Sequence, residues 1–341
     1  MFSTLFALVV SLIVLSTTSA AQNEDTRKRD KNFLIEALPL QLALRVADQD
    51  AMLAQVQLDT AAEPGDWDQR QKGVINAIKI WTPDIPVIRV CFVEGPNSVR
   101  IKIAEIASQW MLPGSSIKFD FGPKTAPRTC STAERVLNHI RIGFRDDGYY
   151  SLIGKDSVTQ ASQAEVSMNF KDFDRSPQPV DDAEFREIVL HEFGHALGLE
   201  HEHQNSKGTC YEEFNWPQVR ALLSSPPNKW SNKEIDFQMG RLMRRGLIAD
   251  KFDAKSIMLY TFPAEYFTNG EQSSCFSLPN RIFSDGDTEL VRRLYPADEV
   301  KRRGVIRDIR AGALQRLEQS GAAAGAKSAV LQIVNNYLTT N

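Results

Sequence analysis

The feature that most constrains this chain is the run HEFGHALGLEH at positions 191–201. Residues four apart on a helix lie on one face, so His191 and His195 present their imidazole rings to a common point. Gly198 accepts a left-handed backbone turn at little cost, and such a turn brings His201 toward the same point. Three protein ligands that leave a fourth position open are typical of a catalytic zinc site.

Glu192 follows the first of these histidines and lies one residue further round the helix. A carboxylate there is near the ion but outside its ligand set, which is where a general base must be to take a proton from activated water. We therefore expect Zn²⁺ as the cofactor, His191, His195 and His201 as its ligands, and Glu192 as the general base of a hydrolase.

Two other kinds of zinc site remain as alternatives. A non-catalytic module that binds peptides or an extracellular partner would hold the metal without turnover, although such a module has no need of Glu192. A structural site needs a closed fourth ligand, and only His203 is nearby; the glycine turn and the spacing favour His201 over His203 as the third ligand. His139 stands alone before a strand and is expected to be structural.

A second motif, SIMLY at positions 256–260, lies downstream of the third histidine. Together with the zinc-binding run it resembles the metzincin clan of zinc endopeptidases, whose second mark is a Met-turn. The resemblance implies that Met258 forms an apolar floor beneath the zinc without binding it. It also implies peptide-bond hydrolysis, with a protein or peptide as the substrate.

Within the clan, the chain is most similar to the astacin family. Glu202 follows the third histidine directly, and Tyr260 stands two residues after the methionine of the Met-turn. The resemblance implies that the Tyr260 phenol helps to stabilise the oxyanion. The sequence departs from the astacin pattern at 203–205, where no arginine follows nearby, and at Leu259, where astacins commonly have histidine. We therefore expect an astacin-like branch of the metzincins.

The resemblance covers residues 76–296 and implies an α+β fold with two lobes. One lobe would hold a mixed, mostly parallel sheet with an antiparallel edge strand and the active-site helix, and the other would be a smaller, irregular or helical C-terminal lobe. Residues 148–154 are similar to the loop, and 166–170 to the edge strand, that precede the active-site helix. Such an edge strand would bind the substrate as an added antiparallel strand. Residues 284–287 are similar to the start of the clan's last helix.

The hydrophobic pattern itself predicts short strands mixed with helices. The best helix is 181–197, where Asp181 and Asp182 supply an acidic first turn and Gly198 supplies the stop. Strands are expected at 78–81, 88–93, 117–121, 140–144 and 166–170, and further helices at 99–111, 216–223, 232–243 and 287–294.

The outer segments of the chain suggest export. Residues 1–21 contain an apolar run followed by small residues, as in a signal peptide, although no Lys or Arg precedes the run. A membrane anchor is the competing interpretation, but the run is shorter than a bilayer span needs. We therefore expect a secreted, extracellular or periplasmic protein with no stable membrane anchor. Residues 297–341 are expected to form a C-terminal helical extension.

Residues 22–75 are interpreted as a pro-segment or an N-terminal arm, with a helix-like apolar pattern from 33 to 58. The PGDW sequence at 64–67 is faintly similar to the astacin pro-segment, whose aspartate blocks the zinc. That resemblance raises the hypothesis of latency through Asp66.

Cysteine and charge content agree with export and argue against one class of partner. The four cysteines are widely spaced and allow three connectivities, of which we predict Cys91–Cys130 and Cys210–Cys275, because each pair then stays on one side of the active-site helix. The net charge of −3 gives no sign of a nucleic-acid partner. The basic clusters at 27–31 and 301–310 are interpreted as solvated surface or linker, with a processing site behind the export signal as the alternative for the first.

Overall fold

The computed structural model describes residues 38–55, 74–131, 137–178, 180–226, 228–241, 247–249 and 251–338. At its centre is a five-stranded sheet in the order β3-β2-β4-β6-β5. Its strands are β2 (Ile88–Phe92), β3 (Phe119–Asp120), β4 (Ile140–Gly143), β5 (Tyr149–Ser151) and β6 (Met168–Phe170). The first four strands in this order pair in parallel and β5 pairs antiparallel with β6, which confirms the expected mixed sheet with one antiparallel edge.

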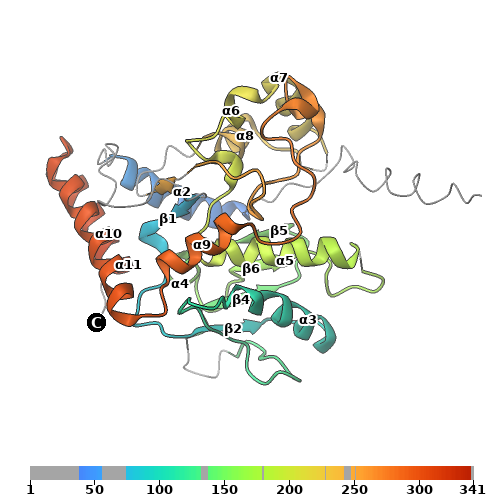
Figure 1. Ribbon diagram of the computed structural model, residues 1–341, viewed down its shortest axis with the longest axis horizontal. Helices are drawn as coiled ribbons and strands as arrows, with labels where there is room; N and C mark the ends of the chain where they lie inside the picture. The colour runs from blue at the N-terminus through green and yellow to red at the C-terminus, as the bar shows by residue number, and fades with distance from the viewer. Residues whose placement is uncertain are drawn as a thin grey trace, which may run out of the picture.

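Two helices pack against each other beside the sheet (Figure 1): α3 (Asn97–Ala107) and α5 (Asp182–Ala196). α3 continues into the short 3-10 helix η2 (Ser108–Trp110). α5 begins where the Asp181 carboxylate accepts hydrogen bonds from the backbone N–H groups of Ala183 and Glu184.

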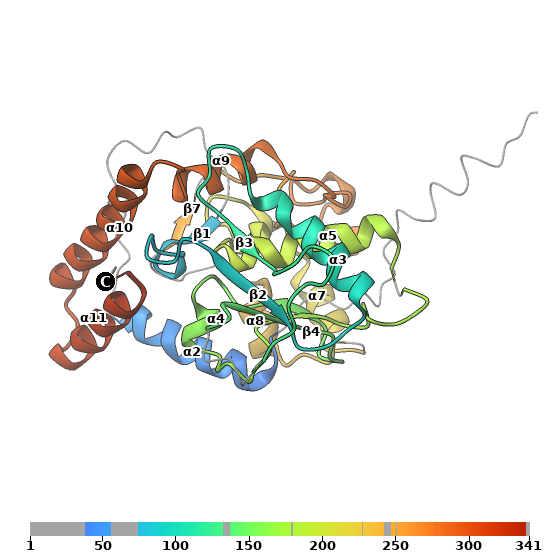
Figure 2. The ribbon, with the colours of Figure 1, turned by 90° about the horizontal axis from the view of Figure 1, so that it is seen from below.

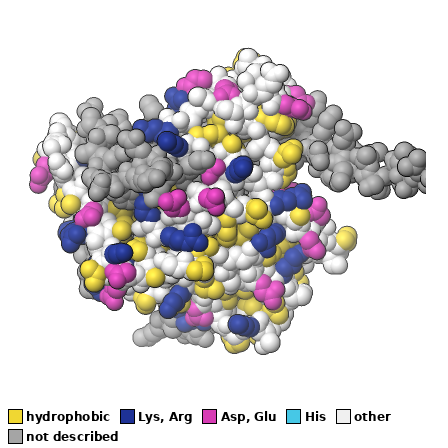
Figure 3. Space-filling model, in the orientation of Figure 1, with side chains coloured by type: hydrophobic (Ala, Val, Ile, Leu, Met, Phe, Trp, Pro, Cys, Tyr) yellow, Lys and Arg dark blue, Asp and Glu magenta, His cyan; other side chains and the backbone are white. Residues whose placement is uncertain are grey.

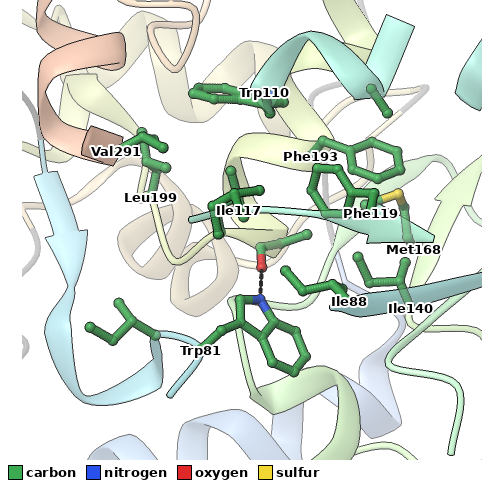
Figure 4. Close-up of a cluster of buried hydrophobic side chains, with 14 of the residues drawn as sticks. Trp81, Ile88, Trp110, Ile117, Phe119, Ile140, Met168, Phe193, Leu199 and Val291 are labelled. Carbon is green, nitrogen blue, oxygen red and sulfur yellow. Dashed lines mark hydrogen bonds between the residues drawn. The ribbon is translucent and has the colours of Figure 1, made fainter. Parts of the chain in front are cut away.

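In the α+β lobe (Figure 1), apolar side chains of α5 bury themselves against the sheet. Phe193 meets the ring of Phe119 edge to face at 5.2 Å, with Met168 beside them (Figure 4). Because this apolar face of α5 is buried in the sheet lobe, another face of the helix is left to carry the candidate site.

A second, smaller lobe lies on the other side of α5 (Figure 1). It consists of loops, the helices α6 (Cys210–Glu213), α7 (Trp216–Leu223) and α8 (Asn232–Met239), and the 3-10 turns η3 (Glu202–Gln204), η4 (Ala264–Tyr266) and η5 (Gly270–Gln272). Its own aromatic-rich core is separate from that of the sheet.

One disulfide lies in each lobe. Cys91 bonds to Cys130, and Cys210 bonds to Cys275. Both predicted pairings are confirmed, and no described cysteine is free.

The chain returns to the sheet lobe through α9 (Asp285–Leu294), whose N-terminus carries a capping box between Ser284 and Asp287. Two long helices follow, α10 (Glu299–Gln319) and α11 (Ala324–Leu338), and they pack against each other as a hairpin. The predicted C-terminal extension is therefore helical over the part of 297–341 that the structure describes.

The N-terminal part of the chain contributes α2 (Leu40–Gln55) and β1 (Val74–Asn76), which pairs antiparallel with β7 (Leu247–Ala249). α2 packs beside β5 and the short helix α4 (Asp156–Thr159), and it also contacts α11 (Figure 2). The helical pattern expected between 33 and 58 is thus confirmed for 40–55. The proposed signal at 1–21 and Asp66 lie outside the described residues.

Two expectations about strands are wrong. Residues 78–81 form no strand but the end of a 3-10 turn, η1 (Ala77–Lys79), and the loop after it. All residues from Ala77 to Trp81 are buried, so this segment is enclosed on every side, and its alternating pattern does not mark a half-exposed strand. The edge strand is not at 166–170, because β6 is interior; β5, in the segment expected to be a loop, forms the edge.

The surface in the view of Figure 1 carries Lys, Arg, Asp and Glu side chains interspersed with apolar ones (Figure 3). Among the described residues, no helix has the length and apolar character that crossing a membrane requires.

Candidate active site

The histidines at 191 and 195 lie on the buried side of the last two turns of α5. The helix is held there from its apolar face by Phe185, Val189 and Phe193, which are fully buried. The Trp110 indole also donates a hydrogen bond of 2.9 Å to the carbonyl of Leu190. The residues that carry chemistry therefore project from a rigid helix.

The three predicted ligands converge. The Nε2 atom of His195 lies 3.1 Å from Nε2 of His191 and 3.0 Å from Nε2 of His201. Tetrahedral zinc with bonds of about 2.0–2.1 Å places its ligand atoms about 3.3 Å apart, so the observed spacing fits one small ion. This trio is the group of potential metal ligands found among the described residues.

The hydrogen bonds of the Nδ1 atoms of His191 and His195 explain why a cation fits between the Nε2 atoms of these two residues. His191 Nδ1 lies 2.8 Å from the Ile257 carbonyl, and His195 Nδ1 lies 2.8 Å from the Leu199 carbonyl. A carbonyl only accepts, so each Nδ1 carries the proton and each Nε2 presents a lone pair. Two lone pairs about 3 Å apart repel each other unless a positive ion lies between them. The donor set therefore fits zinc.

The turn after α5 is held by donors from distant parts of the chain. Gly198 adopts φ +97°, the left-handed conformation that the sequence predicted. The Trp81 indole donates to the Ala196 carbonyl at 2.7 Å (Figure 4), and the Tyr295 hydroxyl donates to the Leu197 carbonyl at 2.7 Å. The turn places the carbonyl of Leu199 next to Nδ1 of His195, and this contact orients the imidazole ring.

The Met-turn lies directly beneath α5. A side chain at Gly194 would collide with the sulfur of Met258, so the glycine inside the zinc-binding run leaves the space that the methionine fills. The backbone of the Met-turn also reaches the ligands, because the Met258 carbonyl accepts a 2.9 Å hydrogen bond from the N–H of Glu202. The turn itself is held by Asp287, which accepts from Ser256 Oγ at 2.6 Å and from the Ile257 N–H at 2.9 Å.

Tyr260 lies against the ligand rings. Its ring is stacked on His191 at 5.5 Å between centroids and lies 4.3 Å from the ring of His201. The ring of His203 also stacks on it, at 5.0 Å between centroids. His203 Nε2 lies 3.0 Å from the Gln238 carbonyl, so His203 belongs to the wall around Tyr260 and not to the ligand trio.

Carboxyl groups near the site are deeply buried. Glu192 is 1% exposed and sits on α5 beside the ligand pair. Burial raises the pKa of Glu202 well above its usual value, against hydrogen bonds from Asn205 and from the backbone of Asp253. Burial also raises the pKa of Asp287 to about 6, although three hydrogen-bond donors favour its charged form.

A small cavity opens beside His195 and His201. Besides these two rings it is lined by residues 151–153 at the end of β5 and just after it, by α4 and α8, and by the segment that carries Glu200 and Gln204. Two side chains from the N-terminal segment, Leu38 and Val46, complete the lining. Its volume is about 40 Å³, enough for water but far below the hundreds of cubic ångströms of a ligand site. α2 therefore narrows the space next to the ligands.

The sequence predicted His191, His195 and His201 as ligands together with Glu192, Met258 and Tyr260, and the structure places these residues close together. Sequence reasoning missed Trp81, Tyr295 and Asp287, which hold the site from outside, and the contribution of α2. The separation along the chain between these residues and the zinc-binding run left no local pattern to detect. The glycine at position 194, inside the motif, was the one sequence signal of a close contact, because a glycine can mark a place where another group packs against the backbone.

Comparison with known proteins points in the same direction. The family model of Astacin, a family of peptidases, matches residues 124–277. The zinc metalloproteinase nas-13 of Caenorhabditis elegans is 29% identical over 202 residues, which are 58% of this chain. The match spans 36% of that relative's own length.

Two solved structures are also similar. The structure of myroilysin shares 30% sequence identity with a TM-score of 0.54, over 66% of this chain and 98% of myroilysin. A crystal structure of myroilysin shares 30% identity with a TM-score of 0.45, over 64% of this chain and 86% of the other.

Proposed function

The chain belongs to the astacin-like branch of the metzincin zinc peptidases, and on that basis we propose that it is a secreted zinc-dependent endopeptidase with Glu192 as its general base. The observation that carries the proposal is the convergence of three Nε2 atoms beside a buried carboxylate on the same helix.

His191, His195 and His201 would hold the zinc ion through Nε2. A bound zinc ion supplies Lewis-acid polarisation of the scissile carbonyl and lowers the pKa of the attacking water toward about 7. The carbonyls of Ile257 and Leu199 keep two of the imidazoles in the tautomer that this binding requires.

Glu192 takes the proton from the attacking water and later gives it to the leaving amine. Glu192 follows His191 directly, so α5 carries the proposed base together with two of the proposed ligands. Tyr260, whose ring stacks on those of His191 and His203, donates its phenolic hydrogen to the oxygen on which negative charge develops.

The substrate backbone would pair with β5. This strand ends the sheet, and a peptide that runs antiparallel to it continues the sheet by one strand. Ser151, the last residue of β5, and the next two residues, Leu152 and Ile153, line the cavity beside the proposed ligands. A peptide on this edge therefore passes the zinc site.

Export is the second part of the proposal. The signal-like pattern at 1–21 and two disulfides, both formed, agree with an oxidising compartment. We further propose that residues 22–75 are a pro-segment that keeps the enzyme latent. Leu38 and Val46 support this, because they narrow the cavity next to His195 and His201.

Gelatin digestion by the Glu192→Gln chain tests the proposal. After limited proteolysis to remove the N-terminal segment, the parent should digest gelatin and lose that activity in a chelator. Glu192→Gln should keep one zinc per chain by atomic absorption and lose turnover by at least about 10²-fold. Glu184→Gln, the same change two turns earlier on α5, serves as the matched control and should stay active.

The outcomes separate this function from its rival. Turnover that survives Glu192→Gln contradicts the assignment of the general base. Stoichiometric zinc with no turnover in the parent chain would instead favour the non-catalytic binding module.

A further inference from the structure

The C-terminal hairpin of α10 and α11 has no part in the mechanism above, yet it reaches the interior of the molecule. Val330, Val334 and Tyr337 of α11 are buried in the main core, and α11 contacts both η1 and α2. Figures 1 and 2 both show α11 on the side of the sheet lobe where α2 lies. The hairpin is thus placed to act on the N-terminal segment.

Tyr337 joins three elements. Its hydroxyl lies 2.6 Å from Asp156 Oδ1 on α4 and 3.0 Å from Gln49 Oε1 on α2. It also accepts a hydrogen bond from Gln160 Nε2 at 3.3 Å and contacts Thr159 Oγ1. Because Tyr337 is 2% exposed and Gln49 is 6% exposed, these bonds are shielded from water, and removing the hydroxyl takes one hydrogen-bond partner from several buried polar atoms.

The position of Tyr337 is itself fixed with respect to the active site. Asp156 forms a fully buried ion pair with Lys79 at 2.7 Å, and Lys155 Nζ donates to the Tyr337 carbonyl at 2.7 Å. Gly154, which precedes Lys155 and Asp156 in the chain, donates its N–H to the carbonyl of His195 at 2.9 Å. A short path of hydrogen bonds therefore links the hairpin to the active-site helix.

The polar contacts of Arg45 on α2 are more exposed than those of Gln49. Arg45 donates to the Gln160 carbonyl at 2.7 Å and pairs with Glu165 at 2.7 Å, but the side chains of this ion pair are both 40% exposed. Exposed ion pairs stabilise little. The apolar contacts of Leu42 and Val46 define the position of α2 along its axis less sharply than the two buried hydrogen bonds that Gln49 Oε1 accepts, from the Tyr337 hydroxyl at 3.0 Å and from Gln160 Nε2. Of these two bonds, the one from Tyr337 ties α2 to the hairpin.

We propose that the hairpin of α10 and α11 is a clamp that docks the N-terminal helix α2 beside the zinc ligands, with Tyr337 as the residue that joins them. The clamp's effect on activity rests on the proposed function, because α2 restrains substrate only in a chain that is a latent peptidase. The clamp's effect on the position of α2 holds whether or not the chain is a peptidase.

Tryptic cleavage after Arg45 tests the clamp directly. The experiment uses the full chain with Glu192→Gln, so that self-cleavage does not interfere. A docked helix is cut only when it opens, and the rate then follows the opening equilibrium. Tyr337→Phe keeps the packing and removes the buried hydroxyl, so cleavage after Arg45 should become about tenfold faster.

Two further variants serve as controls. Gln49→Leu removes from the α2 side both the bond from Tyr337 and the bond from Gln160, and should accelerate cleavage at least as much as Tyr337→Phe. Faster cleavage with Gln49→Leu but not with a cooperatively folded Tyr337→Phe would assign the docking to Gln160 and overturn the clamp. Tyr266→Phe alters a buried tyrosine of the C-terminal lobe and should leave the cleavage rate unchanged. Equal rates at Arg45 for Gln49→Leu and its parent would overturn the clamp.

Peptide hydrolysis separates this inference from the proposed function. With Glu192 intact, the unprocessed chain carrying Gln49→Leu should hydrolyse a peptide substrate several-fold faster than the parent. Faster cleavage after Arg45 without faster hydrolysis supports the clamp and contradicts the latent state. Hydrolysis that is faster although cleavage after Arg45 is unchanged overturns the clamp.

Discussion

At the scale of single residues, the site depends on positions that carry no chemistry. Gly194 has no room for a side chain because Met258 fills the space beneath it. A packing contact between the zinc-binding run and the Met-turn therefore explains why the third residue after the first ligand is a glycine. The motif predicted the ligands, but only the fold revealed this contact.

His139 is a residue whose charge state ties stability to pH. Burial, together with the nearby cations Arg89, Arg141 and Lys155, lowers its pKa to about 4. Its Nδ1 accepts a 2.8 Å hydrogen bond from the Arg89 N–H, which requires the neutral ring. The unfolded chain takes up a proton near pH 6.5 that the folded chain refuses, so stability is present above that pH and falls as the pH drops toward 4.

We expect the free energy of unfolding to fall by about 2 kcal/mol between pH 7 and pH 5 through this residue alone. His139→Asn keeps an acceptor for the Arg89 N–H but does not titrate. Urea denaturation at both pH values should show a drop that is about 2 kcal/mol smaller for the variant than for the parent. The same drop in both chains would mean that His139 titrates normally in the fold.

At the scale of elements, the sequence predicted what local patterns determine. α7 has the predicted bounds, and α5 differs by one residue at each end, because apolar periodicity, an acidic cap and a terminal glycine all agreed there. The edge strand was misplaced because β5 has only three residues and strand order depends on pairing between distant segments. The burial of η1 likewise follows from tertiary packing.

The end of α5 gives a prediction at this scale. The Tyr295 hydroxyl donates to the Leu197 carbonyl and accepts from the Trp81 N–H at 3.2 Å. Tyr295→Phe should lower the free energy of unfolding by about 1–3 kcal/mol, because two buried backbone groups lose their partner. It should also speed zinc loss to a chelator, because the turn that positions His195 and His201 loosens.

Zinc loss, followed with a chromogenic chelator, provides the decisive comparison for this prediction. Tyr266→Phe, in the other lobe, should release zinc at the parent rate. If Tyr295→Phe lost stability but released zinc no faster, the hydroxyl would stabilise the core without positioning the ligands.

At the scale of the whole molecule, segments far apart in the chain meet around one helix. The N-terminal α2 and the C-terminal α11 contact each other beside α4, and α9 holds the Met-turn through Asp287. The domain boundaries expected from the sequence placed these segments in separate units. The sequence contained no signal that the segments contact each other. Contacts between chain segments about 290 residues apart, such as Tyr337 with Gln49, arise only on folding.

The central claim is that three named imidazoles surround one zinc ion, and X-ray absorption at the zinc K-edge tests it most directly. The purified chain and its His203→Ala variant should each show three imidazole ligands at about 2.0–2.1 Å, whereas His201→Ala should show two. A sulfur shell at about 2.3 Å, or a ligand lost in His203→Ala and kept in His201→Ala, would contradict the account.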